Sequence, residues 1–255
     1  MLEYHKIQTV FRRDMTSRQK PLLEGEWTMP EFEYLAHNLW TFTEKVDGTN
    51  IRVMLRDGEV TFGGKTDSAQ MPIPLLAHLE NTFLPLVGKM REIFFGRDVC
   101  LYGEGYGAKI QKGGGNYRRD QAFVLFDVKV GDWWLRRDDV MDVADNLAID
   151  AVPLIGQGTL FDAVAKVREG FLSVWGPFPA EGIVARPKEE LRTRGGERVI
   201  TKIKTRDFPV TPTPRVSKPV SGEGQKPKAQ LEALELPVAK KPLSQWTPRL
   251  PVWVE

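Results

Sequence analysis

The sequence is poor in the residues that build disulfide frameworks and zinc sites. It has one cysteine, Cys100, and three scattered histidines among 255 residues. A single cysteine excludes an intrachain disulfide, and no group of Cys and His has the spacing of a zinc site. Cys100 lies in an apolar run typical of a buried strand, where we expect no reactive thiol. This cysteine usage fits a reducing cytosol.

Long hydrophobic runs and a strong net charge are also missing. No apolar run approaches the roughly 18 residues of a membrane span, and residues 1–6 lack a signal-peptide core, so we expect no transmembrane segment. With 36 basic and 34 acidic residues, the net charge is only +2. Any contact of the chain with nucleic acid must therefore come from local basic patches rather than from the overall field.

Proline is unevenly distributed and divides the chain. Residues 209–255 hold nine of the eighteen prolines. Each proline removes a backbone donor and restricts its neighbour, so these residues predict an extended tail without a domain of its own. Within the tail, residues 229–236 favour a short helix, and residues 246–253 are apolar enough to pack on the body. We expect one domain over residues 1–208.

The body predicts a mixed α and β structure. Period-2 alternation and apolar runs predict strands over residues 41–46, 50–56, 59–62, 99–103, 122–130, 182–185 and 199–204. Helical spacing predicts helices over residues 74–95, 138–147 and 160–169, the second capped by Asp138. Because strands and helices do not alternate regularly, we expect an α+β fold with antiparallel sheets flanked by helices.

One lysine is placed to do chemistry. Lys45 lies at the end of a predicted strand, just before the turn formed by residues 46–49. A free lysine is protonated at neutral pH and cannot attack, but burial and neighbouring cations lower the pKa of such an amine. Without further support, the alternative is a strand-end lysine in a surface ion pair.

Two further lysines and an acid follow in the last predicted strands. Lys202 and Lys204 are two residues apart in a strand and therefore point to the same face, where a phosphate would separate their charges. The alternative is a solvated outer face. Glu181 begins a buried strand and is suited to a metal, directly or through water, or to a ribose hydroxyl. Its alternative is an ion pair with Arg186.

Three segments between these positions complete the candidate site. Glu104 leads an apolar strand into a glycine-rich turn, where a ligand can approach the backbone. Phe126 is a core residue by default, or else a platform on which a base stacks. Residues 108–120 combine basic residues, glycines and Tyr117, which is typical of either a nucleic-acid contact or a solvated loop.

Taken in order, five segments resemble the motifs of the covalent nucleotidyltransferases, the superfamily of polynucleotide ligases and mRNA capping enzymes. The segments are residues 44–50, 101–104, 123–128, 181–184 and 202–204. Asn50 and the opening residues 4–14 look most like the ATP-dependent RNA ligases of the phage and kinetoplastid-editing type. The resemblance implies an ATP-grasp-like ligase adenylation domain over residues 1–208.

The resemblance also implies a reaction and a set of roles. Lys45 would attack ATP to give lysyl-N-AMP, pass AMP to an RNA 5′-phosphate and allow a 3′-hydroxyl to seal the strand, probable work for RNA repair. Mg²⁺ or Mn²⁺ would assist. The implied contacts are adenine for Glu44 and Phe126, ribose and phosphate for Asn50 and Glu104, the α-phosphate for Lys202 and Lys204, and the water shell of the metal for Glu181.

Two departures from the family pattern leave alternatives open. Lys65 stands where relatives usually place a phosphate-binding arginine, so it is the expected phosphate ligand unless Arg52 serves instead. The tail replaces the C-terminal domain of many relatives. A small DNA ligase, a capping-type transferase and a non-catalytic RNA-end-binding module remain alternatives. A compact ligase of this kind suits the cytoplasm of a bacterial or phage-infected cell.

Overall fold

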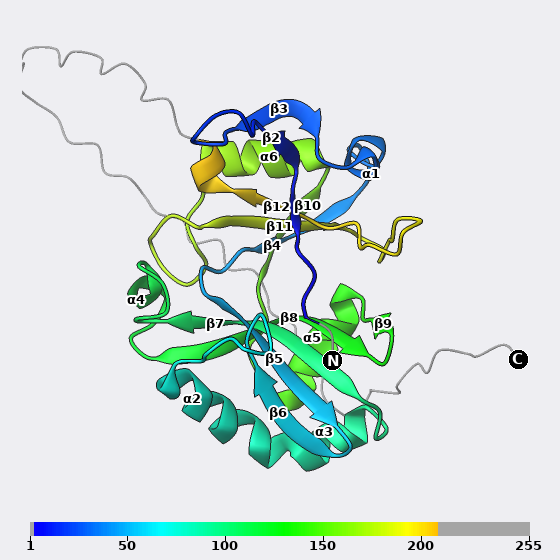
Figure 1. The fold of residues 1–255 in the computed structure, drawn as a ribbon, viewed down its shortest axis with the longest axis vertical. Helices are drawn as coiled ribbons and strands as arrows, with labels where there is room; N and C mark the ends of the chain where they lie inside the picture. Colours follow the sequence, from blue (N-terminus) through cyan, green and yellow to red (C-terminus); the bar gives the residue numbers. More distant parts are fainter. Residues whose placement is uncertain (1–2, 209–255) are drawn as a thin grey trace, which may run out of the picture. The chain divides into compact units, whose positions relative to one another are not determined.

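The computed structural model describes residues 3–208, which belong to one compact unit, and two five-stranded sheets dominate it (Figure 1). In the first sheet the strand order is β1 (Gln8–Thr9), β12 (Thr201–Lys204), β11 (Gly182–Pro187), β4 (Trp40–Glu44) and β10 (Leu154–Gly158). β1 runs parallel to β12 and the other neighbours are antiparallel. A separate pair, β2 (Phe11–Arg13) and β3 (Leu22–Trp27), lies near α1 (Pro30–Tyr34).

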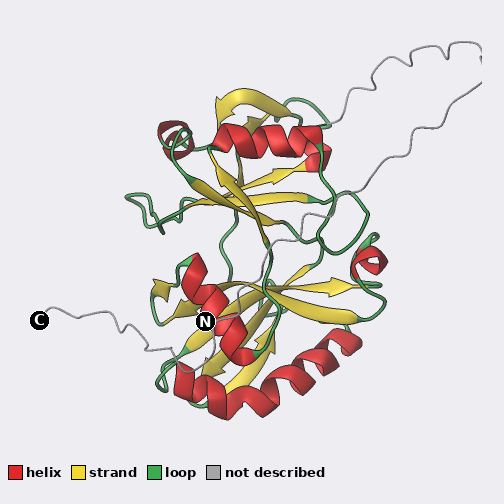
Figure 2. Cartoon of the chain, turned by 180° about the vertical axis from the view of Figure 1, so that it is seen from behind, coloured by secondary structure: helices red, strands yellow, loops and turns green. Residues whose placement is uncertain are grey.

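The second sheet is wholly antiparallel. Its order is β6 (Glu59–Gly63), β5 (Thr49–Arg56), β7 (Val99–Gly107), β8 (Gln121–Val130) and β9 (Trp133–Trp134). Three helices, α2 (Ile73–Phe83), α3 (Val87–Ile93) and α5 (Arg137–Leu147), bury their apolar residues against it (Figure 2). The fold is therefore α+β with antiparallel sheets flanked by helices, as the irregular order of elements predicts.

The first sheet is covered by α6 (Leu160–Glu169), the helix predicted over the same residues. Its start is fixed by a capping box, in which Thr159 and Asp162 each bind the backbone N–H of the other. The helix buries Leu160, Ala163 and Val167 against the sheet. On β12 the same packing buries Thr201 and Ile203 and leaves Lys202 and Lys204 on the opposite face. The predicted common face of the two lysines is confirmed.

Two predicted helix features are wrong. The helix expected over residues 74–95 is divided into α2, a 3-10 turn (Leu84–Leu86) and α3, because Pro85 has no N–H to continue the α-helical ladder. Arg136, not Asp138, occupies the N-cap position of α5, and Asp138 lies in its first turn. There the carboxylate still interacts favourably with the helix dipole.

The sequence predictions about the tail fall on residues 209–255, which lie outside the described residues. These are the extended conformation, the short helix over residues 229–236 and the packing of residues 246–253. Among the described residues, Cys100 is buried in β7, and burial raises the pKa of its thiol to about 11. No helix within residues 3–208 has the length and apolar character needed to cross a membrane.

Candidate active site around Lys45

Lys45 follows directly after β4 and remains tied to the first sheet. Its backbone N–H donates to the carbonyl of Gly182 on β11 at 2.9 Å, which continues the pairing of β4 with β11. The chain then turns through Gly48 into β5. A side chain at Gly48 would collide with the carbonyl oxygen of Gly105 and lie 2.8 Å from Cγ of Glu104. The turn after Lys45 is thus pressed against β7 of the second sheet, and only glycine fits there.

The side chain of Lys45 meets the strand-end residues predicted from the sequence. Lys45 Nζ lies 2.6 Å from Glu181 Oε2, and Lys204 Nζ lies 2.7 Å from Glu181 Oε1. The three side chains are 15–20% exposed, so they are largely but not fully removed from water. One carboxylate therefore bridges two ammonium groups, a charge-assisted arrangement that holds all three side chains in place.

Two ionisable groups beside this bridge have shifted pKa values. Burial, followed by the charges of Lys204 and Lys45, lowers the pKa of Lys202 to about 8. Burial and the carboxylate of Glu181 raise the pKa of Asp47, an effect that Lys45 and Lys204 partly offset. The site thus concentrates more charge than its own groups neutralise, which is typical of functional sites.

A cavity of about 120 Å³ opens beside Lys45. Its lining includes Glu44, Asn50, Glu104, Phe126, Tyr4, Ile7 and Arg186. Glu44 Oε1 and Asn50 Oδ1 are buried, and neither has a hydrogen-bond partner among residues 3–208. The other oxygen of Glu44 accepts the backbone N–H of Val174 at 3.0 Å. Two buried acceptors without partners in one cavity fit a polar ligand that donates hydrogen bonds.

Glu104 lies within β7, directly opposite Asn50 of β5, rather than at the end of a strand. Burial raises the pKa of Glu104 to about 8; Lys45 counteracts this, whereas Glu181 and Asp47 add to it. The side chain also accepts the N–H of Gly48. At neutral pH Glu104 therefore carries a proton and can donate a hydrogen bond into the cavity.

Phe126 belongs to β8 and is half-buried at the cavity. Its ring packs edge-on against Tyr4, with 5.0 Å between the centroids. The carbonyl of Phe126 accepts a hydrogen bond from Arg186 Nη2 at 3.4 Å. The ring is thus held from the N-terminal segment and from β11, while part of its surface faces the cavity.

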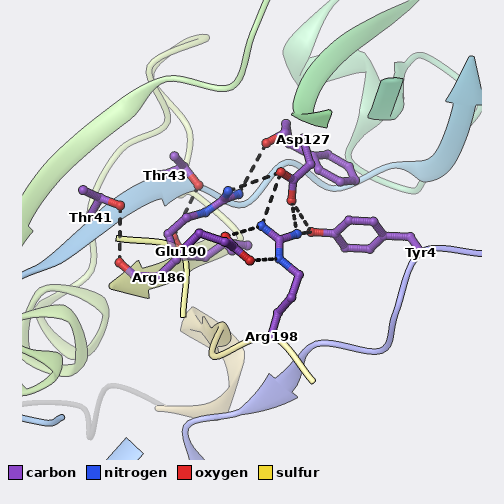
Figure 3. Close-up of polar contacts among 9 residues, drawn as sticks. Tyr4, Thr41, Thr43, Asp127, Arg186, Glu190 and Arg198 are labelled. Atoms are coloured by element: carbon purple, nitrogen blue, oxygen red, sulfur yellow. Dashed lines mark hydrogen bonds and ion pairs between the residues drawn. The ribbon is translucent and has the colours of Figure 1, made fainter. Parts of the chain in front are cut away.

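A buried ionic network next to Phe126 joins the two sheets (Figure 3). Asp127 of β8 is fully buried; its carboxylate lies 2.5 Å from Arg198 Nη1 and 3.4 Å from Arg186 Nη1. Tyr4 donates its hydroxyl to Asp127 at 2.8 Å, and Arg198 also donates to Glu190 at 2.7 Å. Burial alone would raise the pKa of Asp127, but the two guanidinium groups outweigh it and lower the pKa.

This network contains residues that the sequence reasoning missed. Asp127 was treated only as part of an aromatic motif, and Arg186 only as a partner of Glu181. In the structure Glu181 pairs with Lys45 and Lys204, whereas Arg186 pairs with Asp127. The available signal was the presence of a single charge inside each apolar strand, since a fully buried charge needs a partner.

Lys65 is the one candidate that the structure does not bring to the cavity. It is exposed in the loop after β6 and is not among the residues that line the cavity. Arg52 of β5 is fully buried and anchors that loop, because its Nε donates to the Gly64 carbonyl at 2.9 Å and its Nη2 pairs with Asp67 at 2.7 Å. The position of Lys65 therefore depends on Arg52.

The loop over residues 108–120 contacts the turn that carries Lys45. It contains α4 (Gly114–Tyr117), and the hydroxyl of Tyr117 accepts the N–H of Asp47 at 3.2 Å. Gln111 donates to the Gly48 carbonyl at 3.0 Å. The tyrosine ring packs on Tyr106 and Phe178. The segment thus supports the backbone of residues 45–48 in addition to presenting basic side chains.

Comparisons with known proteins agree with this geometry. The family model described as RNA ligase matches residues 38–204, which include Lys45, Glu181 and Lys204. Among solved structures, the chain is similar to Naegleria gruberi RNA ligase with pyrophosphate, at 17% identity and a TM-score of 0.58. The alignment covers 81% of this chain and 57% of that one.

Mutants of the same Naegleria gruberi ligase give similar values. One with ATP and Mn has a TM-score of 0.57 at 17% identity, covering 80% of this chain and 56% of that one. One with AMP and Mn has a TM-score of 0.56 at 17% identity, covering 81% and 57%. The chain thus spans less than three fifths of the ligase that it resembles, and the likeness extends to the fold. No curated protein sequence matches the chain.

Proposed function

The chain belongs to the RNA ligase family, and from this premise we propose that it joins RNA ends through a covalent Lys45–AMP intermediate formed from ATP. The observation that carries the proposal is the position of Lys45. Its amine lies at the edge of a cavity that contains two buried acceptors without partners, and beside two lysines suited to phosphate. Base, sugar and phosphate each have chemically matched surroundings there.

The nucleoside would occupy the cavity. Glu44 Oε1 would accept the exocyclic amino group of adenine, and the base would stack on Phe126, a contact of about 1–3 kcal/mol. Asn50 Oδ1 and the protonated Glu104 would bind the ribose hydroxyls, one as acceptor and the other as donor. Lys202 and Lys204 would bind the α-phosphate. Solved structures of the similar Naegleria gruberi ligase contain ATP or AMP with Mn.

In the first step the amine of Lys45 would lose a proton and attack the α-phosphorus. Glu181 Oε2, 2.6 Å from Nζ, is placed to take that proton. An N–P bond forms, the P–O bond to the β-phosphate breaks, and pyrophosphate leaves. The nearby ammonium groups balance the negative charge of the phosphates, so the protein acts mainly by positioning and electrostatics.

Two further displacements would complete the reaction. An oxygen of the RNA 5′-phosphate attacks the phosphorus bound to Lys45, and the N–P bond breaks to restore the amine. A 3′-hydroxyl oxygen then attacks the RNA 5′-phosphorus, forming the phosphodiester and releasing AMP. We place this activity in the repair of broken RNA with 5′-phosphate and 3′-hydroxyl ends, in the cytoplasm of a bacterial or phage-infected cell.

A divalent cation fits the site only together with the nucleotide. Among residues 3–208 no three His, Cys, Asp or Glu side chains group as metal ligands. Mg²⁺ commonly uses one or two carboxylates, waters and substrate phosphates, so Glu181, acting through water, matches this donor set. Bound Mg²⁺ or Mn²⁺ would neutralise phosphate charge in the first step.

The test is covalent labelling of the protein. Incubation with α-³²P-labelled ATP and Mg²⁺ should give an acid-labile protein label, as expected of a phosphoramidate, and Lys45→Ala should abolish it. GTP in place of ATP separates a capping-type transferase, and nicked DNA against nicked RNA separates a DNA ligase. Full labelling of Lys45→Ala would remove the mechanism, and absence of any label on the wild-type protein would favour a non-catalytic module.

A further inference from the structure

A second concave surface, with a volume of about 740 Å³, lies next to the candidate active site. We call it the basic groove. It is lined by six basic side chains, Lys6, Arg12, Arg13, Lys202, Lys204 and Arg206, and by a single acidic one, Asp207. The basic residues come from the N-terminal segment on one side and from β12 and the turn after it on the other.

The positive charge of the basic groove is not neutralised by the protein. Asp207 is occupied by Arg13, with 2.5 Å between Oδ2 and Nη2, and Lys204 is paired with Glu181. Lys6, Arg12, Lys202 and Arg206 have no ion-pair partner within residues 3–208. Lys202 shows the consequence, since burial and the neighbouring ammonium groups lower its pKa. Such a surface favours binding of an anion that carries several charges.

The basic groove and the nucleotide cavity meet at Lys45. Ile7 lines both of them and forms part of the wall between them. Lys204 lines the groove, and its ammonium group shares the carboxylate of Glu181 with Lys45. The end of the groove at Lys202 and Lys204 is therefore adjacent to the proposed attachment point of AMP, while Arg12 and Arg206 extend the surface beyond it.

Building on the proposed function, we propose that the basic groove binds the phosphodiester backbone of the RNA strand whose 5′-phosphate receives AMP. In the second displacement the 5′-phosphate must reach the phosphorus bound to Lys45. The rest of that strand must then leave the site along a surface that balances one negative charge per nucleotide. The basic groove begins at the required place and carries that surplus of positive charge.

The size and the spread of the charges favour a strand over the nucleotide's own phosphates. Lys202 and Lys204 already supply cations for the α-phosphate and for a departing pyrophosphate. Lys6, Arg12 and Arg206 add three more in a groove about six times the volume of the nucleotide cavity. Their exposed side chains match backbone contacts, which position a strand without reading its sequence.

The test separates RNA use from ATP use in the full-length protein. The variant is Arg12→Ala with Arg206→Ala. The control, Arg97→Ala with Arg194→Ala, removes the same charge from exposed arginines outside the groove. Pre-formed enzyme–AMP is mixed with 5′-phosphorylated RNA in single-turnover experiments. The groove variant should need roughly tenfold more RNA for half-maximal AMP transfer, and its salt dependence should fall by about two phosphate contacts. Its adenylylation by ATP should stay within about twofold of wild type.

Each alternative result has a defined meaning. RNA dependence equal to that of the control double variant overturns the proposal. A raised ATP requirement with unchanged RNA dependence also overturns it and assigns the basic groove to the triphosphate. Absence of enzyme–AMP in the wild-type protein contradicts the proposed function instead. In that case equilibrium binding of the same RNA, followed by fluorescence anisotropy, still tests the groove: equal affinities of the two double variants would refute it.

Discussion

Lys45 Nζ and Glu181 Oε2 lie 2.6 Å apart, and the second oxygen of the same carboxylate holds Lys204 at 2.7 Å. The carboxylate thus occupies a position between two ammonium groups that a phosphate would share in the proposed reaction. It orients the amine of Lys45 and is also its nearest proton acceptor among the contacts of that side chain. We infer that binding of the α-phosphate frees the amine from this bridge.

Glu181→Gln should separate these roles from simple packing. The amide keeps the size of the side chain but cannot take a proton or balance two cations. The rate of enzyme–AMP formation should fall by about two to four orders of magnitude, the range seen for loss of a general acid or base. Rapid-quench labelling with saturating ATP measures this rate directly.

The matched control for that experiment is Glu189→Gln, an exposed carboxylate with no side-chain hydrogen bond or ion pair within residues 3–208. It should label at the wild-type rate. If Glu181→Gln labels as fast as this control, Glu181 neither accepts the proton nor prepares Lys45 for attack.

Asp127→Asn should destabilise the fold strongly. Asp127 is fully buried between Arg186 and Arg198, and an amide cannot balance two guanidinium groups. Removal of one partner from a buried ionic network costs about 3–5 kcal/mol of unfolding free energy. Urea denaturation followed by tryptophan fluorescence gives this value.

The comparison variant is Asp132→Asn, near the end of the same strand, where the carboxylate is fully exposed and pairs with Lys129. Its effect should remain within about 0.5 kcal/mol. The pKa of Asp127 is lowered, so its contribution to stability is present at neutral pH and is lost as the pH falls through its pKa in the folded state. A loss of stability no larger than that of Asp132→Asn would mean that the network does not hold the two sheets together.

Binding of ATP should weaken as the pH rises from 7 to 9. Lys202 and Glu104 both have pKa values of about 8. Over this interval Lys202 loses a positive charge and Glu104 gains a negative one, and both changes oppose binding of a polyphosphate. Loss of the protonated form of Lys202 alone predicts about a tenfold rise in Kd. Calorimetry on Lys45→Ala measures binding without the covalent step.

Two variants assign the titration. Lys202→Arg keeps its charge throughout this range, so the rise in Kd should shrink to the part caused by Glu104. Glu104→Gln removes the other ionisation and should leave only the part caused by Lys202. A rise of unchanged size in both variants would show that neither group controls binding.

The elements of the site were predictable because their patterns are local. Alternation and turn residues located the strands that carry Lys45, Glu104 and Phe126, and the two-residue spacing of Lys202 and Lys204 fixed their common face. These features depend on backbone periodicity, which a sequence displays directly.

The contacts between distant segments were not predictable in the same way. Nothing in the local sequence shows that Glu181 bridges Lys45 and Lys204, or that Asp127 is balanced by arginines 59 and 71 residues away. Such pairings depend on how strands of different sheets face one another. The interruption at Pro85 was visible in the sequence but was outweighed by apolar spacing that continues through it.

The last prediction concerns the extent of the catalytic unit. A protein that ends at Phe208 should fold and form enzyme–AMP within about twofold of the full-length rate, because every candidate residue lies between Glu44 and Lys204. Phe208 itself is required, since it is buried in the core of the first sheet and its N–H donates to the Thr205 carbonyl at 3.1 Å. A protein that ends at Arg206 loses this ring and should be less stable by about 3–5 kcal/mol, the usual effect of deleting a buried phenylalanine. Thermal unfolding and labelling of both truncated proteins provide the comparison: a stable but unlabelled protein ending at Phe208 would place a necessary residue after position 208.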